Sequence, residues 1–264
     1  MSTVVFTIQF GTAGLTQKLG MFCDSGLTYF IFRNLVRDVG AIRALAHAFV
    51  VVAIPTVVAF MVEHQTGRNA FAVFGGVPEM TEVREGTLRC QGAFAHSILA
   101  GCFWASVLPL IMALWWQPGI RRRRVVVGIT CGLAIIVLCA SSTPIVGVVV
   151  GVAGGCLFVL RRHLRVIKWG LVFVLVALHI VMKAPVWSLI QRVDIIGGST
   201  GWYRYQLLNA AIEHFREWWL LGTPSTDSWG MVDMTNQFIL EGVRGGIFSV
   251  ALYVLIFARA FRKV

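Results

Sequence analysis

The sequence has few charged residues, and acidic ones are the scarcest. Of its 264 residues only 13% are charged, with 12 Asp and Glu against 23 Lys and Arg, whereas 57% are hydrophobic. The mean hydropathy of +0.78 excludes an ordinary soluble globular domain of this size and favours a multi-pass membrane protein. The net charge of +11 therefore does not indicate nucleic acid, and the lipid bilayer is the expected partner.

Short motifs typical of soluble enzymes are also missing. The six cysteines form no CxxC pair, and there is no nucleotide-binding glycine pattern, zinc-ligand spacing or nucleophile elbow. Four of the six cysteines fall inside apolar runs, which favours packing roles over disulfides or metal ligands. We expect no metal and no cofactor, so any chemistry must use scattered polar residues.

Six apolar runs are long enough to cross a hydrocarbon core of about 30 Å as helices of roughly 20 residues. The predicted spans are 45–62, 93–116, 125–140, 144–160, 166–182 and 237–258. They predict an all-α polytopic membrane protein with about six transmembrane helices. The preceding segment 1–44 has a short, glycine-broken apolar stretch that is poor as a span and as a signal peptide. It is compatible with the remnant of a helix from a longer protein.

The charged residues sort by membrane side. The segments before the first span, between the second and third, between the fourth and fifth, and after the sixth, together with Lys168 in the first turn of the fifth span, hold fifteen basic residues and two acids. The loops 63–92 and 183–236 hold seven basic residues and nine acids. The positive-inside rule therefore predicts that both termini are cytoplasmic and that these two loops lie outside.

The outer loop 183–236 predicts a helix over 201–221, with Ser199 and Thr200 as possible caps and Gly222 and Pro224 after its end. Its apolar stripe consists of Leu208, Ala211, Phe215, Trp218 and Trp219. An amphipathic helix rich in Trp and Tyr is expected to lie at the membrane surface. Arg204 falls on the stripe side, where it would bind either the phosphate of ordinary lipid or a dedicated ligand. Solvation is sufficient to explain Glu213, His214, Arg216 and Glu217.

A polar stripe runs down the outer half of the sixth span. It is formed by Asp233, Gln237, Glu241 and Arg244, spaced by four, four and three residues. A charge at mid-membrane costs on the order of 2.5–3.5 kcal/mol, so the stripe must face protein or water. Glu241 and Arg244 could neutralise one another, or the stripe could form one wall of an outward-facing polar cavity, and the two interpretations are compatible.

The other outer loop, 63–92, contains glycine pairs, a proline and three arginines, among them Arg89. It is either a solvated connector or part of an outward-facing site. His96 follows in the first turn of the second span. It would hydrogen-bond a neighbouring helix or interfacial water, or contact a charged lipid head group.

Three segments resemble the C-terminal half of the O-antigen ligase and O-antigen polymerase related membrane proteins. "LRCQGAFAHSILAG" is similar to that family's Arg-x-x-Gly-x-Phe start of a membrane helix, matched by Arg89, Gly92 and Phe94. "RYQLLNAAIEHFREWWLLGT" is similar to its arginine, amphipathic helix and closing Leu-Gly, matched by Arg204, Leu221 and Gly222. "TNQFILEGVRGGIFSVALYV" is similar to its His-Asn, glycine-marked start of the next span. The resemblance covers about residues 24–260, and 45–264 would form the membrane domain.

The resemblance implies a protein of cell-surface polysaccharide biosynthesis in the bacterial inner membrane. Such proteins transfer or polymerise a glycan from an undecaprenyl diphosphate carrier on the outer face. Arginines would hold the diphosphate, because guanidinium groups bind phosphates bidentately. The corresponding candidates are Arg204, Arg89 and Arg192, with His96, Asn236, Glu241 and Arg244 as further substrate-binding residues.

One departure bears on the chemistry. The family histidine that acts as general base corresponds to Thr235, and a threonine is no base near neutral pH. Asp233, two residues earlier, is the available substitute.

Two other functions compete with glycan transfer. Without the family histidine, the chain would be a non-catalytic or truncated glycan assembly or export component that binds lipid-linked glycan. A small-solute transporter using Glu241 and Arg244 is the third hypothesis. We rank it last, because the sequence indicates neither an internal repeat nor a broken helix.

Overall fold

The structure is a computed structural model that describes residues 2–84, 86–192, 200–230 and 234–262. It is mostly helical, which confirms the all-α part of the predicted fold class. The chain divides into two compact units. The central unit comprises the described residues within 36–181, and the terminal unit comprises those within 1–35, 182–193 and 199–264.

The central unit is a helical bundle with a small folded loop. Its elements in chain order are α2 (Val39–Thr66), η1 (Ala70–Phe74), β1 (Val83–Arg84), β2 (Thr87–Leu88), α3 (Ser97–Ala113), η2 (Leu114–Trp116), α4 (Arg122–Leu138), α5 (Ser142–Val159), η3 (Arg161–His163) and α6 (Leu164–Val181). The two strands pair antiparallel, with Val83 opposite Leu88. Helix α2 begins where Asp38 Oδ1 accepts a hydrogen bond from the Ala41 N–H at 2.6 Å. It ends at Gly67, in the left-handed conformation (φ 68°) that glycine adopts readily.

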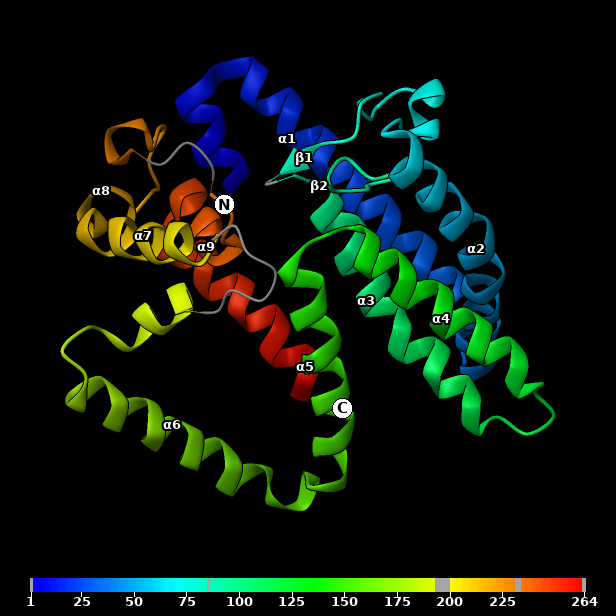
Figure 1. Cartoon of the computed structure of the whole chain (residues 1–264). Helices are drawn as coiled ribbons and strands as arrows, with labels where there is room; N and C mark the ends of the chain where they lie inside the picture. The colour runs from blue at the N-terminus through cyan, green and yellow to red at the C-terminus, as the bar shows by residue number, and fades with distance from the viewer. Residues whose placement is uncertain (1, 85, 193–199, 231–233, 263–264) are drawn as a thin grey trace. The chain divides into compact units, whose positions relative to one another are not determined.

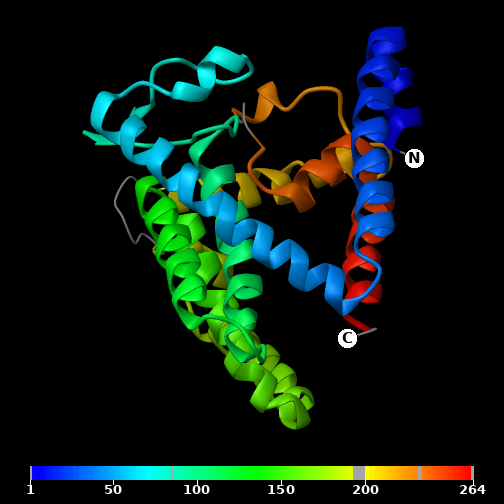
Figure 2. The ribbon, with the colours of Figure 1, turned by 90° about the vertical axis from the view of Figure 1, so that its right-hand side faces the viewer.

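Helices α2, α3 and α4 lie side by side, and α5 packs on α3 (Figures 1 and 2). Glycines permit the close approach. A Cβ at Gly128 of α4 would lie 2.8 Å from Val50 Cγ2 of α2, and one at Gly101 of α3 would lie 2.4 Å from Pro144 Cγ of α5. Small residues at helix interfaces are typical of membrane bundles, since they let backbones approach closely. The largest fully buried apolar side chains of this core are Phe60, Trp104, Ile111, Ile135 and Ile136.

The terminal unit joins both ends of the chain. Its elements are α1 (Ser2–Leu35), η4 (Val186–Arg192), α7 (Thr200–Glu213), α8 (Phe215–Trp218), η5 (Asp227–Trp229) and α9 (Gln237–Arg262). Helix α1 contacts α9, α7 contacts η4, and α8 contacts α9. Figure 2 shows α1 in blue beside α9 in red. The predicted N-terminal segment 1–44 thus begins with a 34-residue helix, which continues through its glycines.

Each of the six predicted spans coincides with a helix. Three helices of the described chain are long and apolar enough to cross a membrane: Val39–Thr66, Ser97–Trp116 and Gln237–Ala260. A shorter apolar helix covers Ser142–Cys156. Helix α2 leaves large apolar side chains exposed, including Val51 (67%) and Val58 (55%). Lipid is the natural environment for such a surface.

The predicted helix 201–221 is wrong in one respect, because it is divided into α7 and α8. His214, between them, has φ −93° and ψ 21°. The Trp218 indole N–H donates a hydrogen bond of 2.8 Å to the Ala211 carbonyl, which Phe215 N–H would occupy in a continuous helix. The predicted stripe shifts accordingly. The buried side chains are Leu207, Ala210, Ala211 and Trp218, whereas Phe215 and Trp219 are each 43% exposed.

Helix α9 is broken, contrary to the expectation from the sequence. Gly245 (φ −160°, ψ 18°) and Gly246 (φ 72°, ψ −175°) both leave helical geometry. Only glycine adopts the second conformation without strain. The break separates the polar start of the helix, from Gln237 to Arg244, from its apolar remainder.

Candidate functional site

The loop 63–92 is a folded cap and not a solvated connector. At its start the Glu63 carboxylate is only 1% exposed. Its Oε1 accepts hydrogen bonds from Thr81 Oγ1 at 3.1 Å and from the Gln91 N–H at 3.0 Å. Its Oε2 accepts from the Gly92 N–H at 2.9 Å. The carboxylate therefore ties two parts of the loop, Thr81 and the segment 91–92, to the end of α2.

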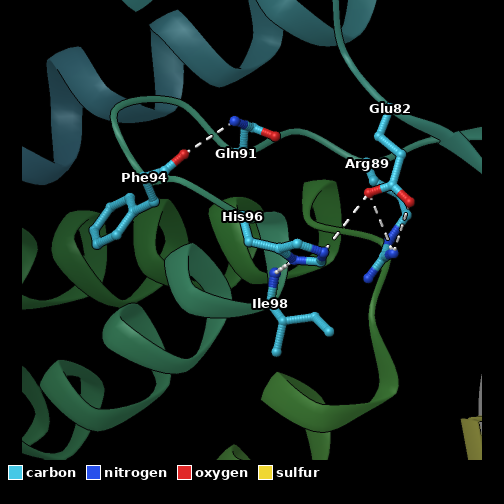
Figure 3. Close-up of polar contacts among 6 residues, drawn as sticks. All are labelled: Glu82, Arg89, Gln91, Phe94, His96 and Ile98. Atoms are coloured by element: carbon cyan, nitrogen blue, oxygen red, sulfur yellow. Dashed lines mark hydrogen bonds and ion pairs between the residues drawn. The ribbon is translucent and has the colours of Figure 1, made fainter. Parts of the chain in front are cut away.

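In the same loop, the side chains of Arg89 and His96 both lie next to the carboxylate of Glu82 (Figure 3). Arg89 is 5% exposed, and its Nη1 donates to Glu82 Oε1 at 3.4 Å and Oε2 at 3.5 Å. His96 Nε2 lies 3.9 Å from Glu82 Oε2. His96 Nδ1 accepts a hydrogen bond of 3.2 Å from the Ile98 N–H, so His96 caps α3. A neutral His96 consequently carries its proton on Nε2, the atom nearest to Glu82.

This Arg89 cluster, formed by Glu82, Arg89 and His96, has the chemistry of an anion site that is filled by a carboxylate of the same chain. The Arg89 Nε is buried and has no hydrogen-bond partner, whereas the Glu82 side chain is 47% exposed. An exposed carboxylate is free to move, and a phosphate would offer the guanidinium more acceptor oxygens. The sequence identified Arg89 and His96, but Glu82 was missed, because nothing local indicates that it folds back onto them.

The glycine of the Arg-x-x-Gly-x-Phe motif has a structural role. Gly92 has φ 56°, and a Cβ there would lie 2.3 Å from Phe60 Cε2. Its carbonyl accepts from Asn69 Nδ2 at 2.7 Å. Gln91 Nε2 donates to the Phe94 carbonyl at 3.0 Å and rounds off the turn into α3 (Figure 3). The motif therefore sets the direction of the chain between Arg89 and His96.

Cys90 is inert, although it is next to Arg89. Its side chain is fully buried. Burial, followed by the nearby Glu63 charge, raises the pKa of the Cys90 thiol to about 12. Because only thiolates are effective nucleophiles, Cys90 is no catalytic candidate.

In the terminal unit, the polar start of α9 is organised around its first turn. Asn236 Oδ1 accepts from the Phe238 N–H at 3.0 Å and the Ile239 N–H at 3.4 Å, which makes Asn236 a helix cap. Gln237 Nε2 donates to Glu241 Oε1 at 2.9 Å. Among the described residues Glu241 and Arg244 form no ion pair, so the expected neutralisation between them is wrong. Both side chains are half-buried.

The break in α9 fits against the segment that closes α8. The Thr223 N–H donates to the Val243 carbonyl, and the Ile247 N–H donates to the Trp219 carbonyl, both at 2.8 Å. A Cβ at Gly222 (φ 82°) would lie 2.2 Å from the Val243 oxygen, and one at Gly246 would lie 2.1 Å from the Leu220 oxygen. The two glycine sites are thus matched to each other.

A polar cluster lies next to this contact between the end of α8 and the break in α9. From the sequence alone, solvation was sufficient to explain two of its residues, His214 and Glu217. His214 Nδ1 and Glu217 Oε1 are 2.6 Å apart, and the Trp229 indole N–H donates to Glu217 Oε2 at 2.8 Å. The His214 and Trp229 rings are stacked, with centroids 5.1 Å apart. The hydrogen bonds from His214 and then Trp229 lower the pKa of Glu217. The missed signal was the spacing of His214 and Glu217 by three residues, which allows contact along a helix.

The remaining candidates are placed less completely. Arg204 is half-buried on α7, and Arg192 ends η4. Asp233, the candidate base, lies outside the described residues, while Thr235 is exposed directly before the cap residue Asn236. The described residues contain no group of three or more His, Cys, Asp or Glu side chains that could hold a metal ion.

These arrangements leave two separate groups of candidate residues, one in each unit. Arg89 and His96 are brought together by Glu82 in the central unit. Asn236, Glu241 and Arg244 share the start of α9 in the terminal unit. In comparisons with known proteins, no family model, no curated protein and no solved structure matches the chain.

Proposed function

We propose that this chain is a multi-pass protein of the bacterial inner membrane that transfers or polymerises a glycan from an undecaprenyl diphosphate carrier. One observation carries the proposal. The closing Leu-Gly after α8 and the glycine-marked start of α9 were singled out separately by their resemblance to one family. In the folded chain they pack directly on each other, through Gly222 and Gly246.

The diphosphate would be held by arginine side chains. The Arg89 cluster supports this role, because a buried guanidinium already holds an exposed carboxylate that an anionic ligand could replace. Arg204 and Arg192 are the candidates in the terminal unit. Positive charge at the leaving diphosphate would stabilise the transition state without requiring a metal.

Deprotonation of the acceptor hydroxyl needs a base, and Asp233 is the proposed one, two residues before Thr235. Asn236, Glu241 and Arg244 would line the same outward-facing mouth. All six predicted spans would cross the membrane, with both termini cytoplasmic and the loops 63–92 and 183–236 outside.

Replacement of Arg204 by alanine tests this function. We expect R204A to abolish assembly of surface glycan in the native host, measured by gel analysis of extracted polysaccharide, while membrane insertion stays intact. The matched control is R216A, which removes an exposed arginine from α8. Normal surface glycan in R204A would refute the proposal.

A non-catalytic glycan-binding component remains the alternative, and Thr235 in place of the family histidine favours it. The variant D233N separates the two functions, because it removes a base but preserves the shape of the side chain. Lost glycan transfer with retained binding of lipid-linked glycan supports catalysis. Unchanged glycan assembly in D233N supports the binder.

A broken helix such as α9 is also typical of transporters, the third function considered, because unwound helices often expose carbonyls to a transported ion. The freed groups here are occupied by protein. The Val243 carbonyl accepts from Thr223, the Ile247 N–H donates to Trp219, and the Gly245 carbonyl accepts from Ser249 Oγ at 3.0 Å. The break therefore serves packing, and glycan transfer remains the better proposal.

A further inference from the structure

A groove of about 550 Å³ runs between α2 and α4, within the ~300–1,000 Å³ typical of small-molecule sites. It is lined by His47, Val50, Val51 and Ile54 of α2 and by Arg123, Arg124 and Val127 of α4. The four α2 residues follow the spacing i, i+3, i+4, i+7, so they share one helix face. The groove is lined almost wholly by apolar atoms, and the side chains of Arg123 and Arg124 that border it are exposed.

The polar and apolar parts of the groove are arranged along its length. Gly128 lies against Val50 in the first half of α4 and of α2, while nearer their ends Leu138 and Phe60 both contact the segment 90–92. The two helices consequently run parallel. His47, Arg123 and Arg124 lie toward their beginnings, and the apolar walls continue from there along both helices.

Aromatic residues mark the level of the basic end. Trp115 and Trp116 follow α3 and are exposed, and the Arg122 guanidinium lies over the Trp115 ring at 5.1 Å. Tryptophans gather at membrane–water interfaces. The basic end of the groove would therefore be at head-group level, and its valine and isoleucine walls would face the acyl chains.

Within the part of the chain that the structure describes, no acidic side chain pairs with the arginines at this end. Arg123 and Arg124 are exposed and form no ion pair among the described residues. The first turn of α4 contains no acidic residue. Asp38, the acid at the start of α2, caps its own helix.

We propose that this groove binds one anionic phospholipid. Its phosphate would contact Arg123 and Arg124, and an acyl chain would lie along Val50, Val51, Ile54 and Val127. A zwitterionic lipid brings an ammonium group that cancels the charge of its phosphate, so it would compensate the two arginines less well. A free phosphate would make no use of the apolar walls. Basic pockets between membrane helices on the cytoplasmic side suit anionic head groups.

The test uses the full chain purified in nonionic detergent, with dioleoylphosphatidylglycerol or dioleoylphosphatidylcholine added at equal mole fraction. Native mass spectrometry counts the retained lipids. We expect selective retention of phosphatidylglycerol. The double variant R123Q/R124Q should weaken it by about 10- to 30-fold, since each basic side chain near an anionic lipid contributes roughly a fivefold effect.

Two further variants make the test specific. The pair R162Q/R165Q removes the same charge outside the groove and should retain phosphatidylglycerol as the wild type does. The variant V51W fills the groove at an exposed position and should lose the lipid although both arginines remain. Equal retention of the two lipids, or equal losses in R123Q/R124Q and R162Q/R165Q, would overturn the proposal. Stabilisation by inorganic phosphate as strong as that by the lipid would also overturn it, since the site would then recognise a free anion.

Discussion

Gly222 is the residue on which the joint between α8 and α9 depends most directly. Its φ of 82° lies in the left-handed region, and the space that a Cβ would need is taken by the Val243 carbonyl. For G222A we expect a loss of at least about 1–2 kcal/mol from backbone strain alone, with a further loss from the overlap. The melting temperature of the detergent-solubilised protein measures the combined effect.

Gly230 offers the matched control for this prediction. It also has a positive φ, 69°, but a Cβ there would meet nothing within 4 Å. The variant G230A therefore reports the backbone strain without the overlap, and the difference between the two variants isolates the contact with Val243. Equal shifts in melting temperature would show that the close approach at Gly222 contributes nothing.

Single residues show most clearly what a local pattern can reveal. Arg89, His96 and Asn236 were selected as substrate-binding candidates, which stays a prediction, and each forms hydrogen bonds in the structure. For His96 and Asn236 the structure shows a role other than the expected substrate binding, because each caps a helix. Glu63 and Glu82 were not selected, because their importance arises from hydrogen bonds to residues between 7 and 29 positions away in the chain. Such pairs are set by the path of the loop, which no local pattern specifies.

Among the short elements, α8 depends on the cluster of His214, Glu217 and Trp229. The lowered pKa of Glu217 means that its ionised form is favoured in the folded protein. Its stabilising contribution is therefore complete above the ordinary glutamate pKa of about 4.3 and is lost as the pH falls through the folded value. We expect the difference in melting temperature between the wild type and E217Q to be full at pH 7 and to shrink progressively as the pH falls below the ordinary glutamate pKa.

The control for this prediction is E213Q, which changes an exposed carboxylate on α7 that forms no ion pair among the described residues. Its melting temperature should follow that of the wild type at every pH. A difference between E217Q and the wild type that does not shrink at all as the pH falls below the ordinary glutamate pKa would mean that the Glu217 charge is not the stabilising feature.

The helix boundaries show which features of the helices the pattern of apolar residues could predict and which it could not. The apolar runs located six helices, because each run and its polar ends are local features. The interruption at His214 and the break at Gly245 and Gly246 were not predicted. Both depend on partners elsewhere, the Ala211 carbonyl for the Trp218 indole and the Trp219 and Leu220 carbonyls for Gly246. A glycine pair in an apolar run is equally compatible with close packing of an unbroken helix, so the break itself left no distinct signal.

For the whole molecule, the number of crossings decides on which side the C-terminus lies. If all six helices cross, the C-terminus is cytoplasmic. If only α2, α3 and α9 cross, it lies outside, because an odd number of crossings separates the two ends. We expect a green fluorescent protein fused after Val264 to fluoresce, and alkaline phosphatase fused in the loop after Gly76 to be active.

A phosphatase fused in the turn at Gly119 is the control, since both schemes place this turn inside and its activity should be low. A dark C-terminal fluorescent protein on a correctly inserted chain would contradict the six-span topology. The positive-inside charge distribution favours six spans, with fifteen basic residues on the proposed cytoplasmic side.

The sequence by itself determined the helical class of the protein and the position of six of its helices, because hydropathy, charge and helix length are properties of contiguous residues. It also selected segments that resemble one family of glycan-handling membrane proteins. Only the tertiary structure decided which polar groups meet. It placed Glu82 on Arg89, joined Gly222 to the broken α9, stacked His214 on Trp229 and opened the basic groove between α2 and α4. Each of these features depends on atoms from distant parts of the chain, and their positions are fixed by packing rather than by any local pattern.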